Sequence, residues 1–245
     1  MTTDRSDMAD RSDLADRSDP LSANAPADCC TVEVDPRIAR HFDKSMRDRA
    51  AAGALPEMVA VSRRLLEMLS DARELRPTVL ELGVGSGALS VALLERGAAA
   101  ATGIDLSPES VATAQRRAAG AGVDERATFV VGDGAQASLN AHDWVILDRV
   151  ICCYPDMDRL LANAIGAARP RVAFSVPPSS GWAGWVARLI VTFENAAMRF
   201  RRRQCPGYVH DIRQIETRLA DAGFTRSRHA RVSLWYAAVW ERPTA

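Results

Sequence analysis

Residues 78–87 read TVLELGVGSG, a short apolar run with β-branched residues that ends in three closely spaced glycines. Such a run predicts a buried strand, and the glycines after it predict a tight turn. The stretch ALSVALLERG (88–97) then has the composition of a helix that ends at Gly97. A strand, a glycine-rich turn and a helix in this order are typical of the first unit of a Rossmann-like sheet.

The same alternation continues along the chain. Short apolar runs predict strands at 100–105, 127–133, 143–148 and 171–176, with helices at 108–120 and 156–168 between them. A helix at 211–223 and strands at 224–232 and 233–242 follow. This rhythm predicts an α/β fold, namely a Rossmann-like, doubly wound, mostly parallel seven-stranded sheet with a terminal antiparallel strand pair.

Three segments lie outside this alternation. Residues 1–28 repeat the letters DRSD with one apolar residue per repeat, so we expect a disordered tail. Residues 35–70 have helical spacing and predict an N-terminal helical cap on a domain that spans 29–245. Residues 177–207 interrupt the strand pattern and are interpreted as a lid insertion.

Composition excludes several classes of protein. The formal net charge is zero, so no nucleic-acid partner is expected. Five cysteines, an odd number that includes two vicinal pairs, indicate neither a disulfide framework nor a metal site. No secretion signal or membrane-spanning stretch is visible, which favours a cytoplasmic protein. Nothing in the pattern indicates an oligomeric state.

Three acidic residues accompany the glycine turn. The turn and Ala88 together fit the G-x-G-x-x-A pattern of a nicotinamide dinucleotide site. However, Glu81 lies inside the first strand, where such sites usually keep an apolar residue. Asp105 ends the second strand, where a carboxylate can accept the ribose hydroxyls of an adenosine. Asp133 follows the third strand, where it can accept a hydrogen bond from an adenine amino group.

The segments ELGVGSG (81–87), GIDLS (103–107) and VVGDG (130–134) together resemble the class I S-adenosylmethionine-dependent methyltransferase family. The resemblance covers about residues 75 to 245 and implies S-adenosyl-L-methionine as the cofactor. It implies that the glycines contact the amino-acid part, Asp105 the ribose and Asp133 the adenine. The full set of expected cofactor-binding residues is Glu81, Gly83, Gly85, Gly87, Asp105, Leu106, Asp133, Gly134 and Asp148.

A narrower resemblance concerns the acceptor side. The segment LDRVICCYPD (147–156) and the closing SLWYAAVWER (233–242) are similar to the magnesium-protoporphyrin IX methyltransferase family. That family methylates a propionate on a flat macrocycle and usually has a catalytic histidine before its Tyr-Pro pair, where this chain has Cys153. The candidate catalytic residues are Tyr154, Cys153 and His210. The alternative is that Pro155 and Asp156 only start the next helix while the cysteines pack.

The segment GWAGWVARLIVTFENAAMRFRRR (181–203) has two interpretations. Its aromatic and aliphatic residues could line a lid over a large apolar acceptor, while its arginines suit an acidic substrate group or weak contact with an anionic membrane surface. Alternatively, it is a helix packed on the sheet with a solvated basic end.

The leading hypothesis is methyl transfer from S-adenosylmethionine to a small or medium-sized organic acceptor. A magnesium-protoporphyrin-like O-methyltransferase is the narrower alternative. Two others are an NAD(P)-dependent oxidoreductase and a non-catalytic module that binds S-adenosylmethionine. The oxidoreductase is disfavoured by Glu81, by the Gly-Asp-Gly at 132–134 and by the absence of a Tyr-x-x-x-Lys pair.

Overall fold

The computed structural model describes residues 36–51, 55–70, 76–200 and 207–243. The strands are β1 (Thr78–Leu82), β2 (Ala100–Asp105), β3 (Ala127–Val131), β4 (His142–Asp148), β5 (Ala168–Val176), β6 (Thr225–Val232) and β7 (Trp235–Glu241). The α-helices are α1 (Pro36–Ala51), α2 (Ala60–Ser70), α3 (Ala88–Glu95), α4 (Pro108–Gly120), α5 (Met157–Ala167), α6 (Gly181–Phe200) and α7 (Ile212–Asp221). Short 3₁₀ turns lie at Asp124–Arg126 and Ile151–Cys153.

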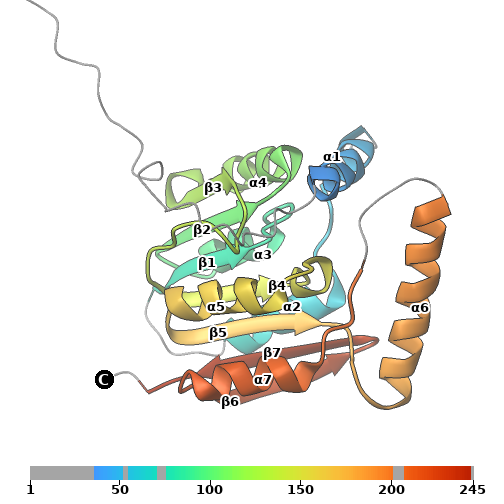
Figure 1. The fold of residues 1–245 in the computed structure, drawn as a ribbon. Helices are drawn as coiled ribbons and strands as arrows, with labels where there is room; N and C mark the ends of the chain where they lie inside the picture. Colours follow the sequence, from blue (N-terminus) through green and yellow to red (C-terminus); the bar gives the residue numbers. More distant parts are fainter. Residues whose placement is uncertain (1–35, 52–54, 71–75, 201–206, 244–245) are drawn as a thin grey trace, which may run out of the picture. The chain divides into compact units, whose positions relative to one another are not determined.

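The seven strands form one sheet in the order β3-β2-β1-β4-β5-β7-β6 (Figure 1). The five strands from β3 to β5 are parallel, and β7 runs antiparallel to both β5 and β6. The predicted doubly wound sheet with a terminal antiparallel pair is therefore confirmed. Strand order reverses between β1 and β4, and ligands of open α/β sheets bind at the carboxyl ends of the strands at such a point.

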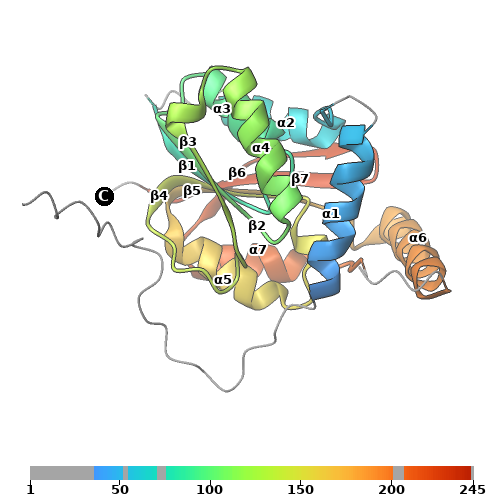
Figure 2. The same ribbon diagram turned by 90° about the horizontal axis from the view of Figure 1, so that it is seen from above.

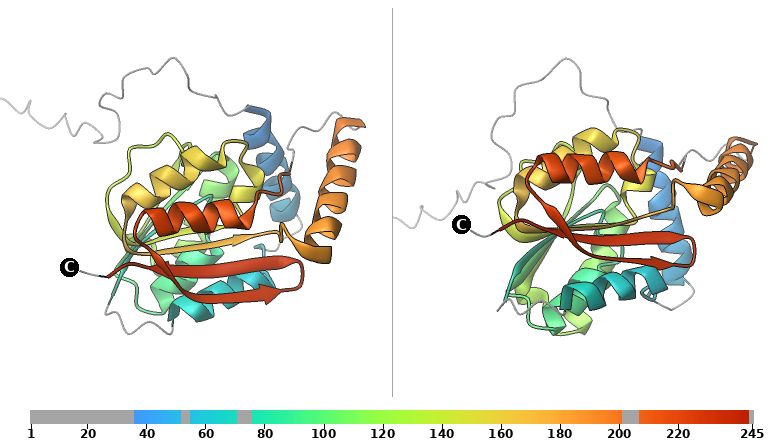
Figure 3. Two further views of the ribbon diagram at one scale, coloured as in Figure 1. Left: turned by 60° about the horizontal axis from the view of Figure 1, so that its bottom comes forward. Right: turned by 90° about the horizontal axis from the view of Figure 1, so that it is seen from below.

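Helices cover both faces of the sheet (Figures 2 and 3). Helices α2, α3 and α4 lie on one face, and α5 and α7 lie on the other. Because successive strand residues point to opposite faces, Val79 of β1 joins the first layer while Leu80 and Leu82 join the second. A strand buried on both sides must be apolar nearly throughout, which is why Glu81 stands out in the sequence.

Capping residues in the sequence mark the N-termini of helices α4 and α5. The hydroxyl of Ser107 accepts a hydrogen bond from the backbone N–H of Ser110, and Pro108 occupies the first turn of α4. Asp156 caps α5 in the same way by accepting from the N–H of Arg159. The interpretation that Pro155 and Asp156 precede a helix start is therefore confirmed.

The structure also refines the expected boundaries. Helices α1 and α2 occupy the 35–70 segment, and α6 lies within the 177–207 segment. The third strand ends at Val131 instead of residue 133, so Gly132 to Gly134 belong to the loop after it. The predicted tail (1–28) and the Cys29–Cys30 pair lie outside the described residues. Among the described residues, no helix is long and apolar enough to cross a membrane.

Candidate functional site

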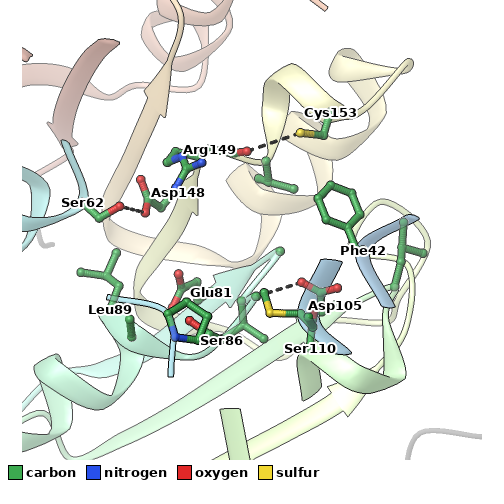
Figure 4. A pocket seen from close by; sticks show the side chains of 18 of the residues that line it. Phe42, Ser62, Glu81, Ser86, Leu89, Asp105, Ser110, Asp148, Arg149 and Cys153 are labelled. Carbon is green, nitrogen blue, oxygen red and sulfur yellow. Dashed lines mark hydrogen bonds between the residues drawn. The ribbon is translucent and has the colours of Figure 1, made fainter. Parts of the chain in front are cut away.

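A pocket of about 270 Å³ opens at the carboxyl ends of β1, β2 and β4 (Figure 4). Its walls come from the glycine turn after β1, from the loops after β2 and β4, and from helices α1 and α2. The volume is near the lower end of the range for small-molecule sites. Of the expected cofactor-binding residues, the pocket brings together Glu81, Gly83, Gly85, Asp105, Leu106, Gly134 and Asp148.

The glycine turn presents its backbone to this pocket. Gly85 has φ +54°, and a Cβ atom built on it would meet no other atom within 4 Å, so the ligand side of the turn is open. Gly83 has φ +73°, and its added Cβ would lie 2.5 Å from the Val150 side chain. Both positions therefore require glycine, Gly83 for close packing and Gly85 for its left-handed backbone beside the pocket.

Gly87 lies where two helices pack closely. It has φ +72°, and an added Cβ would lie 2.8 Å from the Cβ of Ala114 on α4. Gly87 is not among the residues that line the pocket. Its absent side chain lets α3 and α4 approach each other, so the geometry supports a packing role, and its predicted cofactor contact stays a prediction.

Glu81 points into the pocket from the middle of the sheet (Figure 4). Its Oε2 atom accepts hydrogen bonds from the backbone N–H of Ser90, at 3.1 Å, and from the Ser90 hydroxyl. Burial raises the pKa of Glu81 to about 8, with a further contribution from Asp148. The group is therefore protonated at neutral pH and ionises most readily when a cation enters.

Asp105 ends β2 and faces the glycine turn. Its two carboxylate oxygens accept from the backbone N–H groups of Gly85, at 2.8 Å, and Ser107, at 2.9 Å. Burial raises its pKa, although these two bonds act in the opposite direction. A carboxylate can accept about four hydrogen bonds, so capacity remains for a pair of ligand hydroxyls.

Asp148 ends β4 and joins the cap to the sheet. One carboxylate oxygen accepts from the hydroxyl of Ser62 on α2, and the other accepts from the hydroxyl of Ser175 on β5. Asp148 was predicted to lie near the methionine part, but neither serine was predicted. They lie 86 and 27 residues away in the sequence, so no local pattern could have indicated the contact.

Helix α1 forms a second wall. Ile38, Phe42 and Met46 line the pocket at four-residue spacing, an apolar stripe on an otherwise polar helix. Asp43 accepts from the hydroxyl of Ser107, at 2.5 Å, and from the backbone N–H of Glu109, at 3.1 Å. Helix α1 is thereby attached to the start of α4. The stripe indicates a helix with one buried face, and the structure shows that this face covers the pocket.

Asp133 lies beside the pocket and is already engaged. It accepts from the Tyr154 hydroxyl, from the backbone N–H of Ala135 and from the Gln136 side chain, while its neighbours Gly132 and Gly134 line the cavity. Burial, followed by the bond to Asp133, raises the pKa of the Tyr154 hydroxyl. Tyr154 is therefore a poor base, and its hydroxyl is directed at Asp133.

Cys153 lines the pocket, whereas His210 does not. The Cys152 and Cys153 thiols lie 3.8 Å apart, and the hydrogen bond from Cys152 lowers the pKa of Cys153. His210 donates from Nε2 to the carbonyl of Tyr154 at 3.0 Å, because a carbonyl can only accept. The backbone N–H of Tyr208 likewise donates to the carbonyl of Cys152 at 2.7 Å. The segment before α7 thus holds the 152–154 loop in place.

The described part of the 181–203 segment contributes no residue to the pocket lining. Trp182, Trp185 and Phe193 are instead mostly exposed. The expected lid contact therefore stays a prediction. The alternative, a helix packed on the sheet with a solvated basic end, also stays a prediction, and Trp182, Trp185 and Phe193 take no part in such packing because they face solvent.

Sequence comparisons agree with this geometry. Residues 79–171 match the family model described as a methyltransferase domain. Release factor glutamine methyltransferase of Rhodospirillum rubrum is 42% identical over 69 residues, which are 28% of this chain and 21% of that protein. Ribosomal protein L11 methyltransferase of Yersinia pseudotuberculosis is 38% identical over 64 residues, 26% of this chain and 22% of that protein. The chain thus matches only about a fifth of the length of these curated relatives.

Solved structures share the fold over most of the chain. Magnesium protoporphyrin IX methyltransferase from Synechocystis PCC 6803 with bound S-adenosylhomocysteine has a TM-score of 0.66 at 20% identity, covering 84% of this chain and 98% of that chain. The [4+2]-cyclase SpnF has the same TM-score at 14% identity, covering 86% of this chain and 96% of that chain. At such identities the likeness shows the fold, and the cyclase shows that this fold does not specify one reaction.

Proposed function

We propose that this chain, which shares its fold and its matched methyltransferase domain with the S-adenosylmethionine-dependent methyltransferases, transfers a methyl group from S-adenosylmethionine to a small or medium-sized organic acceptor. One observation carries the proposal: Glu81, Asp105 and Asp148 meet around a single pocket beside the open Gly85 (Figure 4). Three acidic groups suit a donor that carries a sulfonium and an ammonium group. Neighbouring structures with bound S-adenosylmethionine and S-adenosylhomocysteine support this cofactor.

The same carboxyl groups disfavour a nicotinamide dinucleotide. In a dinucleotide site the pyrophosphate lies at the glycine turn and the following helix N-terminus. Here the carboxyl groups of Asp105 and Asp148 line the same pocket as the glycine turn, so two phosphate charges would meet acidic groups at short range. The electrostatics therefore favour a cationic donor.

The acceptor side suits a carboxylate acceptor, which the resemblance to propionate methylation also favours. Methyl transfer mainly requires alignment of the nucleophile with the sulfonium carbon, and a carboxylate is already ionised at neutral pH without a base. Neither Tyr154, which is bonded to Asp133, nor His210, outside the pocket, is needed as a base. Arg49 and Arg149 line the pocket and pair with no carboxylate among the described residues, so they can attract an anionic acceptor.

Substitution of Asp105 tests the donor site. Loss of two charge-assisted hydrogen bonds to ribose predicts that Asp105→Ala weakens S-adenosylmethionine binding about 100-fold or more by calorimetry. Glu109→Gln, outside the pocket lining, is the matched control and keeps wild-type affinity. Unchanged affinity in Asp105→Ala refutes the ribose assignment. If the wild-type protein binds NADH but does not bind S-adenosylmethionine, the proposed function is refuted.

Turnover distinguishes an enzyme from a binding module. Formation of S-adenosylhomocysteine is measured with a panel of acceptors that contains carboxylates, amines and phenols, with magnesium-protoporphyrin IX among the carboxylates. The proposal expects acceptor-dependent product, highest with carboxylates and reduced at least about tenfold in Arg149→Gln because the acceptor loses a charge partner. Donor binding without product from any acceptor class would indicate a non-catalytic module.

A further inference from the structure

Two adjacent cysteines lie together at one wall of the pocket. Cys152 and Cys153 belong to the short 3₁₀ turn Ile151–Cys153, and both are half-buried free thiols. Their sulfur atoms lie 3.8 Å apart. Each thiol also donates to the carbonyl oxygen of Arg149, at 3.5 Å from Cys152 and 3.7 Å from Cys153 (Figure 4). The turn therefore directs both thiols toward one acceptor and toward each other.

The two thiols differ in acidity. The hydrogen bond from Cys152 and then the charge of Arg149 lower the pKa of Cys153, although burial acts in the opposite direction. The same hydrogen bond and burial raise the pKa of Cys152. Cys153 is therefore the better nucleophile, and Cys152 keeps its proton. A thiolate with a second thiol beside it is typical of cysteines that peroxides oxidise reversibly.

A metal site and simple packing account for this pair less well. Within the part of the chain that the structure describes, no third His, Cys, Asp or Glu joins the two thiols as a metal ligand. Structural cysteines are buried and inert. Cys153 instead lines the pocket, where a small solute can reach it.

The peptide group between the two cysteines is held at both of its polar atoms. The carbonyl of Cys152 accepts from the backbone N–H of Tyr208 at 2.7 Å, and the N–H of Cys153 donates to the carbonyl of Val150 at 2.9 Å. Adjacent Cα atoms are about 3.8 Å apart across a trans peptide bond, closer than the usual range of about 4.4–6.8 Å for a disulfide. A disulfide here therefore distorts this peptide group and weakens at least one of its two hydrogen bonds.

Distortion of this peptide group reaches the pocket from both sides. Val150 lines the pocket, and its side chain fills the space beside Gly83. After the pair, the Tyr154 hydroxyl donates to Asp133. A strained disulfide is also more easily reduced, so the change is reversible.

We propose that Cys152 and Cys153 form a dithiol modification site that a hydroperoxide oxidises to a disulfide, and that this disulfide weakens donor binding in the adjacent pocket. The oxidation site is independent of the proposed function, whereas its effect on the donor rests on that function.

The chemistry takes two steps. The Cys153 thiolate attacks the terminal oxygen of the hydroperoxide, so an S–O bond forms and the O–O bond breaks, and the leaving oxygen takes up a proton to become water or an alcohol. Cys152 then loses its proton and attacks the Cys153 sulfur, so the S–S bond forms, the S–O bond breaks and water leaves. The hydroperoxide gains the electron pair that the two thiols lose, and a small thiol reductant returns it.

Peptide mapping of the full chain tests the oxidation. Trypsin cuts after Arg149 and Arg159, so residues 150–159 form a peptide that contains both cysteines and none of the others. After treatment with hydrogen peroxide and then an alkylating agent, this peptide should carry no alkyl group and should lack two hydrogen atoms. Dithiothreitol before alkylation should restore both alkyl groups. Full alkylation after peroxide, or a disulfide to a cysteine outside this peptide, overturns the proposal.

Single variants test the role of each thiol. In Cys152→Ser, Cys153 should stop at the sulfenic acid, which dimedone traps, because no second thiol attacks it. In Cys153→Ser, Cys152 should react at least about tenfold more slowly, because it keeps its proton. Cys205→Ser, outside the peptide, is the matched control and should form the disulfide like the wild type. Equal rates of dimedone labelling in the first two variants would overturn the assigned order of attack.

Donor affinity tests the effect on the pocket. In a chain with Cys29→Ser, Cys30→Ser and Cys205→Ser, the pair supplies the only thiols. Calorimetry with S-adenosylhomocysteine should show binding at least about fivefold weaker after peroxide and full recovery with dithiothreitol. The same chain with Cys152→Ser and Cys153→Ser should show no effect of peroxide.

The outcomes separate the oxidation site from the donor site. Equal affinity of the reduced chain and of the chain with a mapped disulfide overturns the effect on the donor. A reduced chain that binds no S-adenosylhomocysteine refutes the proposed function and that effect together, while the peptide map still decides the oxidation site.

Discussion

Glu81 is a completely buried carboxyl group whose hydrogen bonds come from one residue, Ser90. Its presence in the first strand could be read from the sequence, because a charge there interrupts an apolar run. Its protonation could not, because the pKa depends on burial by side chains from distant elements and on the carboxylate of Asp148. The other pocket residues divide in the same way: Asp105 follows a local pattern, whereas Ser62 reaches Asp148 only in the folded chain.

The raised pKa of Glu81 predicts how stability depends on pH. Between its ordinary value of 4.5 and about 8, the folded protein holds a proton that the unfolded chain has released. The contribution of Glu81 to the free energy of unfolding therefore falls as pH rises. The decrease is about 1.4 kcal/mol per pH unit across this window. Urea denaturation of the unliganded protein should show this slope.

Glu81→Gln should remove that slope because glutamine does not titrate. Glu95→Gln, an exposed substitution on α3, should retain it. Calorimetry in two buffers of different ionisation enthalpy should also show proton release when the cationic donor binds near pH 7. If Glu81→Gln keeps the wild-type dependence on pH, the carboxyl group is already ionised in the folded state.

Helix α1 is an element whose helical character was predictable and whose position was not. Its apolar spacing indicates a helix with one buried face, but nothing in it indicates that this face covers a ligand pocket. Asp43 determines its position by bonding Ser107 and Glu109 at the start of α4. The same short region therefore ends β2, begins α4 and holds the wall of the pocket.

Asp43→Ala should weaken S-adenosylmethionine binding about fivefold, because α1 loses its attachment beside Asp105. It should also lower the free energy of unfolding by about 1 kcal/mol, because the backbone N–H of Glu109 at the start of α4 loses its acceptor. Asp48→Ala is the matched control on the same helix. Asp48 forms an ion pair with Lys44 on the surface, a contact worth about 0.3–0.5 kcal/mol. Calorimetry and urea denaturation separate the two effects. Equal affinity in both variants would show that α1 does not depend on Asp43 for its position.

Across the molecule, the order and type of the elements were predictable because each strand and helix has its own hydrophobic period and turn residues. The alternation of strands and helices predicted a doubly wound parallel sheet, whereas the order of its strands comes from the structure. The exposed face of α6 was not predictable, since an apolar stripe on a helix is ordinarily buried. Only the three-dimensional arrangement shows that its small residues are covered and its tryptophans are not.

Donor binding should stabilise the whole domain. At a concentration of S-adenosylhomocysteine 100 times its dissociation constant, linkage predicts about 2.7 kcal/mol of added stability. For a domain of this size, that corresponds to a rise in Tm of about 5–10 °C. Thermal unfolding with and without the ligand measures it, and NADH at the same concentration should leave Tm unchanged. A rise with NADH and none with S-adenosylhomocysteine would contradict the assigned pocket chemistry.

Strand β7 lies between β5 and β6, so one late segment supplies hydrogen bonds to both. During synthesis on the ribosome, β5 is complete more than fifty residues before its antiparallel partner exists. Its edge is unpaired throughout that interval, and an unpaired edge is a template for association with other chains. The order of translation therefore leaves this edge of the nascent sheet open to association until residues 235–241 have emerged.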